Sequence, residues 1–334
     1  MHTPFNPSIY QGRSEPFEDH WAQYWYQHIG AYQDQLVALI GFACDQGVNR
    51  NQGRIGAKHA PNVIKSALGK LPIGINLQKH HDDLSCLVGD VGNIACVDGD
   101  VIADDLLETA QNDYAQTVGK LIQNGKTVIG IGGGHEIAFA SFRGLYQGLA
   151  DNKKRIGIIN LDAHFDLRSD KYASSGTPFL QIANSLKAES KPFDYLAIGI
   201  SDFANTASLF AKADALGVGV IGEDDCLRLP FGDVQKRMDD FIAQVDVLYV
   251  TLDLDVLMAA VMPAVSAVNA KGLPLDFVER CLDHIIQTGK VGMMDIAEFN
   301  PNYDIDGHGA KVAGRILAKM IEQILLHCPH QKQP

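Results

Sequence analysis

The chain has 334 residues, of which 46% are hydrophobic and 20% charged, an ordinary composition for a globular protein. Its 40 acidic and 28 basic residues give a formal net charge of -12, which argues against non-specific binding to nucleic acid or to an anionic membrane surface. No segment approaches the roughly 18 uninterrupted apolar residues of a membrane span, and the first residues lack the pattern of a signal peptide. We therefore expect a cytoplasmic protein that acts on small molecules.

The first 34 residues are rich in polar and aromatic types and show no sustained periodicity. We expect residues 1–34 to form an N-terminal arm, with a short helix near Asp19 to His28, that packs on the main body or on a neighbouring subunit. From residue 35 to 328 we predict a single catalytic domain, because the candidate ligands described below are spread along it. Residues 329–334 are expected to form a tail.

Short apolar runs then recur along the chain, and helical patterns separate them. Such runs predict strands that are buried on both faces, as in a parallel sheet built from βαβ units. Residues 82–100 mix apolar pieces with glycine turns, and no regular element is assigned to them. Amphipathic helices are predicted at 104–123 and near the C-terminus. The predicted strands are 36–42, 127–131, 155–161, 195–200, 216–221, 246–252 and 291–294.

The loop at 43–56 follows the first predicted strand, at the edge where α/β proteins place substrate contacts. It carries Arg50 and Arg54, for which surface solubility is the simpler interpretation of each taken singly. The six cysteines include no Cys-x-x-Cys pair, and a chain of this length needs no disulfide framework, so we expect most of them to be reduced thiols. They are Cys44, Cys86, Cys96, Cys226, Cys281 and Cys328.

Three polar side chains stand two residues apart directly after the predicted strand at 155–161. Asp162, His164 and Asp166 would leave an extended backbone on the same face. Two carboxylates and an imidazole at the end of an apolar strand repel one another and lose solvation, and a divalent cation removes both penalties. This array predicts a metal site, although a solvated acidic loop would have the same local sequence.

Two further segments support the metal interpretation. Asp253 and Asp255 again stand two apart after a strand, and His135 follows the glycines at 132–134, which let the backbone approach closely. Asp-x-Asp alone also occurs in calcium loops and phosphotransferases. Together the segments supply two imidazoles and four carboxylates, whose charges balance two divalent ions. Mixed oxygen and nitrogen ligands without cysteine suit Mn²⁺ better than structural zinc.

The three segments, in this order, resemble the motifs of the ureohydrolase family, which includes arginase and agmatinase. The resemblance covers roughly residues 36–326. It implies a three-layer α/β/α fold with a mainly parallel eight-stranded sheet, and a homo-oligomer, either a trimer or a hexamer. It also implies two Mn²⁺ ions per subunit, bridged by a hydroxide that hydrolyses a C–N bond at an amidino carbon.

The resemblance also assigns roles to single residues. Glu298 matches the glutamate that grips the cationic amidino group, although an ion pair at a strand end is the alternative. Asp166 would also move a proton from the attacking oxygen to the departing amine. The implied metal ligands are His135, Asp162, His164, Asp166, Asp253 and Asp255.

Departures from the arginase pattern indicate the branch of the family. Ser175 stands where arginase and agmatinase have a histidine, and Gly134 replaces an aspartate. These features, with the loop at 47–54, are similar to formimidoylglutamase, which implies hydrolysis of N-formimidoyl-L-glutamate to L-glutamate and formamide. Arg168 and Arg54 could clamp the carboxylates of this anionic substrate. The expected substrate-binding residues are Arg168, Arg54, Ser175 and Glu298.

Three alternatives stay open from the sequence. The chain could be an agmatinase or guanidino-acid ureohydrolase that releases urea. It could also be a metal-binding family member without catalysis, because ligands alone do not prove turnover. A deacetylase of related architecture would need adjacent histidines as acid/base groups, and none lies near these motifs.

Overall fold

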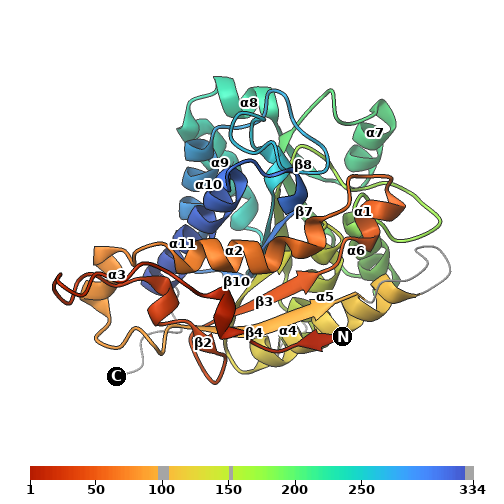
Figure 1. The fold of residues 1–334 in the computed structure, drawn as a ribbon. Coiled ribbons are helices and arrows are strands. Elements are labelled where there is room, and N and C mark those ends of the chain that lie inside the picture. The colour runs from red at the N-terminus through yellow and green to blue at the C-terminus, as the bar shows by residue number, and fades with distance from the viewer. Residues whose placement is uncertain (97–104, 150–152, 328–334) are drawn as a thin grey trace.

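Eight parallel strands form the centre of the protein, seen here in a computed structural model (Figure 1). The structure describes residues 1–96, 105–149 and 153–327; Cys328 and the predicted tail at 329–334 lie outside this part. The spatial order is β4-β3-β5-β10-β9-β6-β7-β8, and every neighbouring pair in it is parallel. The strands are β3 (Val37–Ala43), β4 (Val88–Ala95), β5 (Thr127–Gly132), β6 (Ile156–Leu161), β7 (Asp194–Ile200), β8 (Gly219–Gly222), β9 (Val247–Asp253) and β10 (Val291–Ala297).

Each strand sends alternate side chains to opposite faces of the sheet, and both faces are apolar. In β3, Val37 and Leu39 join one hydrophobic cluster, whereas Ala38, Ile40 and Phe42 join the other. This pattern requires helices on both faces. The strands therefore read as continuous apolar runs in the sequence rather than as alternating ones.

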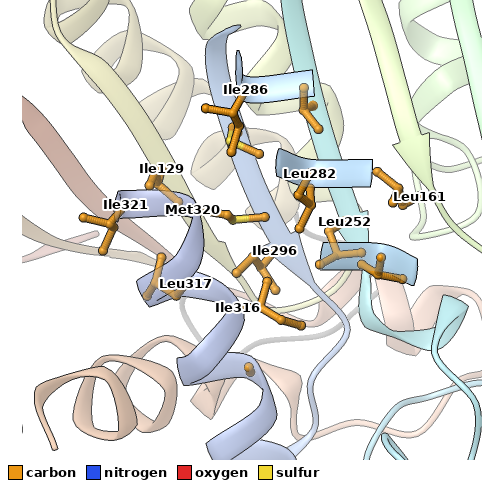
Figure 2. Packing of buried hydrophobic residues seen from close by; sticks show 14 of the residues in the cluster. Ile129, Leu161, Leu252, Leu282, Ile286, Ile296, Ile316, Leu317, Met320 and Ile321 are labelled. Carbon is orange, nitrogen blue, oxygen red and sulfur yellow. The ribbon is translucent and has the colours of Figure 1, made fainter. Parts of the chain in front are cut away.

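Helices cover both faces of the sheet, which gives the predicted three-layer arrangement. In Figure 2, Leu282 of α10 and Leu317 and Met320 of α11 pack over Ile296 of β10. One face carries α2 (Ala60–Gly69), α3 (Ile75–His80), α8 (Glu223–Arg228), α9 (Phe231–Ile242), α10 (Leu275–Gln287) and α11 (His308–His327). The other carries α4 (Leu106–Gln123), α5 (Ile137–Gly148), α6 (Pro178–Ala188) and α7 (Ala207–Ala215). No helix in the described ranges has the length and apolar character needed to cross a membrane.

The N-terminal arm adds two very short strands to the sheet, so the sheet has ten strands rather than the expected eight. β1 (His2–Thr3) pairs antiparallel with β4, and β2 (Gly30–Ala31) pairs with it in parallel. The prediction of a helix at 19–28 is wrong, because this stretch has only a 3₁₀ turn, η2 (Trp25–Gln27). Trp25 is buried there, as are Tyr10, Tyr24 and Ile29 elsewhere in the arm, so separate buried side chains, not a helical stripe, hold the arm.

Strand β4 was not predicted, because its sequence is polar for a strand that is mostly buried. Asp90, in the middle of β4, is buried and pairs with the buried Lys65 of α2 at 2.7 Å. Lys65 also donates to the carbonyl of Gly92 and to Asn93 Oδ1, and Tyr10 of the arm donates to Asp90 Oδ2 at 2.9 Å. Every charge in this network has partners, which is the condition for burying charge in a core.

A disulfide joins the ends of two neighbouring strands, which the sequence did not indicate. It links Cys44, directly after β3, to Cys96, directly after β4. Because β3 and β4 are parallel neighbours, with Ala43 opposite Ala95, their carboxyl ends bring the two thiols together. Cys86, Cys226 and Cys281 are free thiols, in agreement with the expectation for most of the cysteines.

Candidate metal centre and substrate pocket

The sequence-predicted site residues meet at the carboxyl ends of the four central strands. β5, β10, β9 and β6 are neighbours in the sheet. His135 follows β5 by three residues, Glu298 directly follows β10, Asp253 ends β9, and Asp162 directly follows β6. This placement arises because parallel strands all end at the same edge of a sheet.

The imidazole of His135 is surrounded by carboxylates. Its Nδ1 lies 3.2 Å from Asp162, 2.9 Å from Asp166 and 3.2 Å from Asp253, measured to Oδ2 in each case. This nitrogen is buried and has no hydrogen-bond partner. The other nitrogen, Nε2, lies 3.0 Å from the Thr251 hydroxyl, which fixes the ring. A ring held by one nitrogen while the other faces oxygen ligands is the usual arrangement of a metal-binding histidine.

A second group of possible ligands adjoins the first. His164 Nδ1 lies 2.9 Å from Asp255 Oδ2 and 3.4 Å from Asp162 Oδ1. Asp162 therefore faces one histidine with each of its two carboxylate oxygens. Within each group the candidate ligand atoms lie within 4.8 Å of one another. The donor set is oxygen and imidazole nitrogen only, which fits Mn²⁺, and the shared carboxylate fits two adjacent ions.

The protonation equilibria of the site reflect crowded, buried charge. Burial, together with the charge of Asp162, raises the pKa of Asp255 to about 6, although His164 acts in the opposite direction. Burial raises the pKa of Asp166 and of Asp253 as well, each with help from nearby carboxylates. Burial alone would lower the pKa of His135, but the surrounding aspartates outweigh it and raise this pKa well above its usual range. A divalent cation is the group that relieves both the repulsion and the lost solvation.

Two site residues adopt a backbone conformation that side chains usually avoid. Asp166 has a φ of 50° and Glu298 a φ of 70°, both in the left-handed region. Each such conformation costs about 1–2 kcal/mol for a residue other than glycine. At Glu298 the loop is fixed by its own amide, which donates to the carbonyl of Gly133 at 2.8 Å. Strain of this kind is typical of residues whose side chains must point in a set direction.

Asparagines behind the ligands fix the segment that follows β6. Asn160 donates to Asp162 Oδ2 at 3.0 Å and to the hydroxyl of Tyr195 at 2.9 Å. Asn205 accepts from the amide of Phe165 at 3.1 Å and donates to the carbonyl of Ala163 at 2.8 Å. These contacts orient the ligand-bearing turn from outside the candidate metal centre.

A pocket opens onto the ligands. Glu298 lies in its wall, where Oε1 accepts from the amide of His135 at 2.8 Å and Oε2 has no partner. Burial, followed by the charge of the neighbouring Glu136, raises the pKa of Glu298 to about 8. The lining residues are Asn51, His135, His164, Asp166, Arg168, Ser175, Ala204, Asn205, Leu209, Asp253, Asp255, Ser266, Ala267 and Glu298.

Three of the four expected substrate-binding residues line this pocket, namely Glu298, Arg168 and Ser175. Arg54 does not. Its guanidinium donates to the carbonyls of Val265, Pro263 and Ser266 and lies 4.0 Å from the ring centroid of Tyr303. Backbone carbonyls thus occupy Nε and Nη2 of Arg54, and the side chain serves the loop at 263–266 rather than the pocket wall.

Several residues of the pocket wall could not be predicted from the sequence. Ser266 and Ala267 lie in the long connection between β9 and α10, whose sequence carries no chemical signature. Asn205 follows β7 on a turn that had no motif. Asn51 stands in the loop at 47–54 that was noted for its resemblance, and its amide could have been identified there.

Comparisons with known proteins agree with this fold. Residues 35–322 match the model of the arginase family. A formimidoylglutamase from Psychrobacter cryohalolentis is 47% identical over 343 aligned positions that cover 98% of this chain and 99% of that protein. The chain belongs to the arginase family, as the sequence resemblance predicted.

Two solved structures have the same fold. Formimidoylglutamase from Bacillus subtilis aligns with a TM-score of 0.80 at 21% identity, covering 94% of this chain and 95% of that one. Trypanosoma cruzi formiminoglutamase, solved with Mn²⁺, aligns with a TM-score of 0.76 at 24% identity, covering 88% and 95%. At this level of identity the two structures support the fold alone, and the expected α/β/α architecture is confirmed.

Proposed function

We propose that this protein hydrolyses N-formimidoyl-L-glutamate to L-glutamate and formamide. The proposal rests on one observation: the pocket offers an acceptor for a cationic group at one place and a cation for an anionic group at another. At the ligand groups, the Oε2 of Glu298 is without a partner and can accept from a cationic amidino group. On another part of the wall, Arg168 presents a cation for a carboxylate. The relatives that carry the name formimidoylglutamase support the same choice.

Two Mn²⁺ ions per subunit, held by His135, Asp162, Asp166 and Asp253 and by Asp162, His164 and Asp255, would supply an activated water at neutral pH. In the reaction the water oxygen bonds to the amidino carbon, and the bond from this carbon to the glutamate nitrogen breaks. Asp166 lies in the pocket wall, where it can accept a proton of the water and pass it to that nitrogen.

Glu298 binds and orients the amidino group in this proposal. Its carboxylate is fixed by the amide of His135, so the free oxygen has a set direction toward the pocket. Ser175 lines the wall near Arg168, and no histidine stands at that position. A guanidinium substrate with a cationic far end, such as agmatine, would meet the charge of Arg168 and be repelled.

The test is a substrate panel with product identification. Purified protein loaded with Mn²⁺ should release formamide and L-glutamate from N-formimidoyl-L-glutamate, with no urea from arginine, agmatine or guanidino acids. The variant Asp166→Asn should lose hydrolysis. Release of urea from a guanidino substrate, with formimidoylglutamate left intact, would show that the protein is a ureohydrolase of another specificity. Full metal binding without any turnover would indicate a non-catalytic family member.

A further inference from the structure

One amide side chain joins the two polar residues on the substrate side of the pocket. Asn51 Oδ1 accepts a hydrogen bond from Arg168 Nη1 at 2.9 Å, and Asn51 Nδ2 donates to Ser175 Oγ at 3.2 Å. All three residues line the pocket. Asn51 belongs to a different segment from Arg168 and Ser175, more than 110 positions earlier in the chain.

Arg168 needs such a contact, because little else holds its side chain. The residue is exposed, and among the described residues no carboxylate lies within ion-pair distance of its guanidinium. The facing residue is Gly176, where an added Cβ would lie 3.1 Å from Arg168 Cδ and 3.4 Å from the amide of Asn51. Glycine at this position leaves room for both side chains. The guanidinium is thus held beside Asn51 and keeps its full charge.

Asn51 is itself held firmly. It follows the last residue of the short helix α1 (Gln46–Arg50), and its backbone N–H donates to the carbonyl of Gly47 at 3.0 Å. The preceding residue, Arg50, is largely buried and donates to Glu108 of α4 at 2.7 Å and to the carbonyl of Ala173 at 3.0 Å. The backbone beside Asn51 is therefore tied to a neighbouring helix and to the segment that carries Ser175.

The chemistry of the three groups explains why an amide stands here. A guanidinium only donates hydrogen bonds, so its partner must accept, and the same partner donates to the serine hydroxyl. An amide does both while staying neutral. A carboxylate at this position would also accept from Arg168, but it would pair with the guanidinium and cancel the charge that attracts an anionic substrate.

We infer that Asn51 is a specificity-determining positioning residue, which holds Arg168 at the pocket without neutralising it, so that the pocket selects amidines bearing a carboxylate. This inference rests on the proposed function and deepens it. In this inference the substrate is selected by Arg168 together with the neutral amide of Asn51 that positions it, and not by Arg168 alone.

The variant Asn51→Asp tests the inference, because it has nearly the same shape and still accepts from Arg168, but it places a negative charge beside the guanidinium and replaces the donor to Ser175 Oγ by an acceptor. KM for N-formimidoyl-L-glutamate should rise on the order of 10-fold or more, the size expected from losing a charge-assisted contact with substrate. The activity toward N-alkyl formamidines, which carry no carboxylate, should change far less. The ratio of kcat/KM for the two substrates is thus the quantity to measure.

Two controls keep the experiment decisive. Asn184→Asp, on the exposed surface of α6, adds the same charge away from the pocket and should leave the ratio unchanged. Arg168→Gln should lower the ratio by itself, and adding Asn51→Asp to it should lower the ratio by a smaller factor than the same change in the wild type, because only the direct repulsion between the new carboxylate and the substrate remains. A purely structural role would give additive losses. Metal content and thermal unfolding of each variant are measured alongside.

The outcomes separate the two hypotheses. If the wild-type protein does not hydrolyse formimidoylglutamate, the proposed function fails. If the wild type is active and Asn51→Asp leaves the substrate ratio unchanged, or lowers it equally with and without Arg168, the inference on Asn51 is overturned and the proposed function stands.

Discussion

Asp162 has a position that none of the other five candidate ligands shares, because its two oxygens face two different histidines. Its side chain is fully buried, and Asn160 and the amide of His164 both donate to it. Loss of its charge should therefore affect both candidate ions at once, whereas loss of Asp253 or Asp255 removes a ligand from one group only.

The variant Asp162→Asn tests this role. We expect the loss of both bound Mn²⁺ ions and a fall in activity greater than the roughly 10- to 100-fold that the loss of an outer contact costs. Metal analysis of the dialysed protein and steady-state kinetics measure the two effects. Asp170→Asn, an exposed aspartate of the same segment, is the matched control and should retain both ions. Retention of two ions by the Asp162 variant would contradict the shared-ligand arrangement.

At the scale of elements, the connection between β9 and α10 shows how a polar contact far from the ligands can shape the pocket. Arg54 donates to three carbonyls of this connection, and the Arg54 amide donates to Ser266 Oγ at 2.9 Å. At the other end, Glu223 of α8 accepts from Asn269 at 2.8 Å and from the amide of Gly272 at 2.9 Å. Ser266, at the first of these anchors, is thereby held in the pocket wall.

We predict that Arg54→Met frees residues 263–267 and acts on the pocket indirectly. The three carbonyls would lose their donor, and an unsatisfied buried polar group costs about 1–3 kcal/mol. Hydrogen exchange should rise in this segment, and kcat/KM should fall for substrates with and without a carboxylate alike. The exposed Arg228→Met is the control. A loss confined to anionic substrates, without faster exchange, would mean that Arg54 binds substrate directly, as the sequence analysis expected.

The strands and the contacts between distant segments show what the sequence could and could not predict. Seven of the eight parallel strands of the central sheet coincide with apolar runs, because a strand covered by helices on both faces must be apolar throughout. The eighth, β4, was missed because Asp90 breaks its pattern, and only the distant Lys65 explains the charge. The metal-ligand segments were visible because their spacing after strands is local. The contacts of Arg54 and Asn51 were not, because they depend on residues more than 100 positions away.

For the whole molecule, the crowded carboxyl groups predict how stability depends on pH when no metal is bound. Burial raises the pKa of Asp255 to about 6 and the pKa values of Glu136 and Glu298 to about 8, all above their values in the unfolded chain. Such groups favour the folded state while they are protonated, and this contribution is lost as the pH rises through 6 and then 8. The metal-free protein should therefore be less stable at pH 8.5 than at pH 5.

Bound metal should reverse this trend. Its ligands must be deprotonated, so Mn²⁺ binds more tightly at higher pH, and a ligand at 100 times its Kd adds about 2.7 kcal/mol to the free energy of unfolding. We expect the increase in Tm on adding Mn²⁺ to be larger at pH 8.5 than at pH 5, as measured by calorimetry. Removing the metal with a chelator should return the Tm to the metal-free value. An equal increase at both pH values would contradict the proposed ligand set.

The arm strands β1 and β2 also affect whether a second molecule can add a strand to the sheet. Both pair with β4, at the end of the sheet where its backbone groups would otherwise face solvent. An unpaired edge strand is a template onto which a second chain can add its own strand. The arm therefore occupies a position that another molecule could take. A chain lacking residues 1–34 should aggregate at concentrations where the full chain does not, because its sheet would end in an open edge.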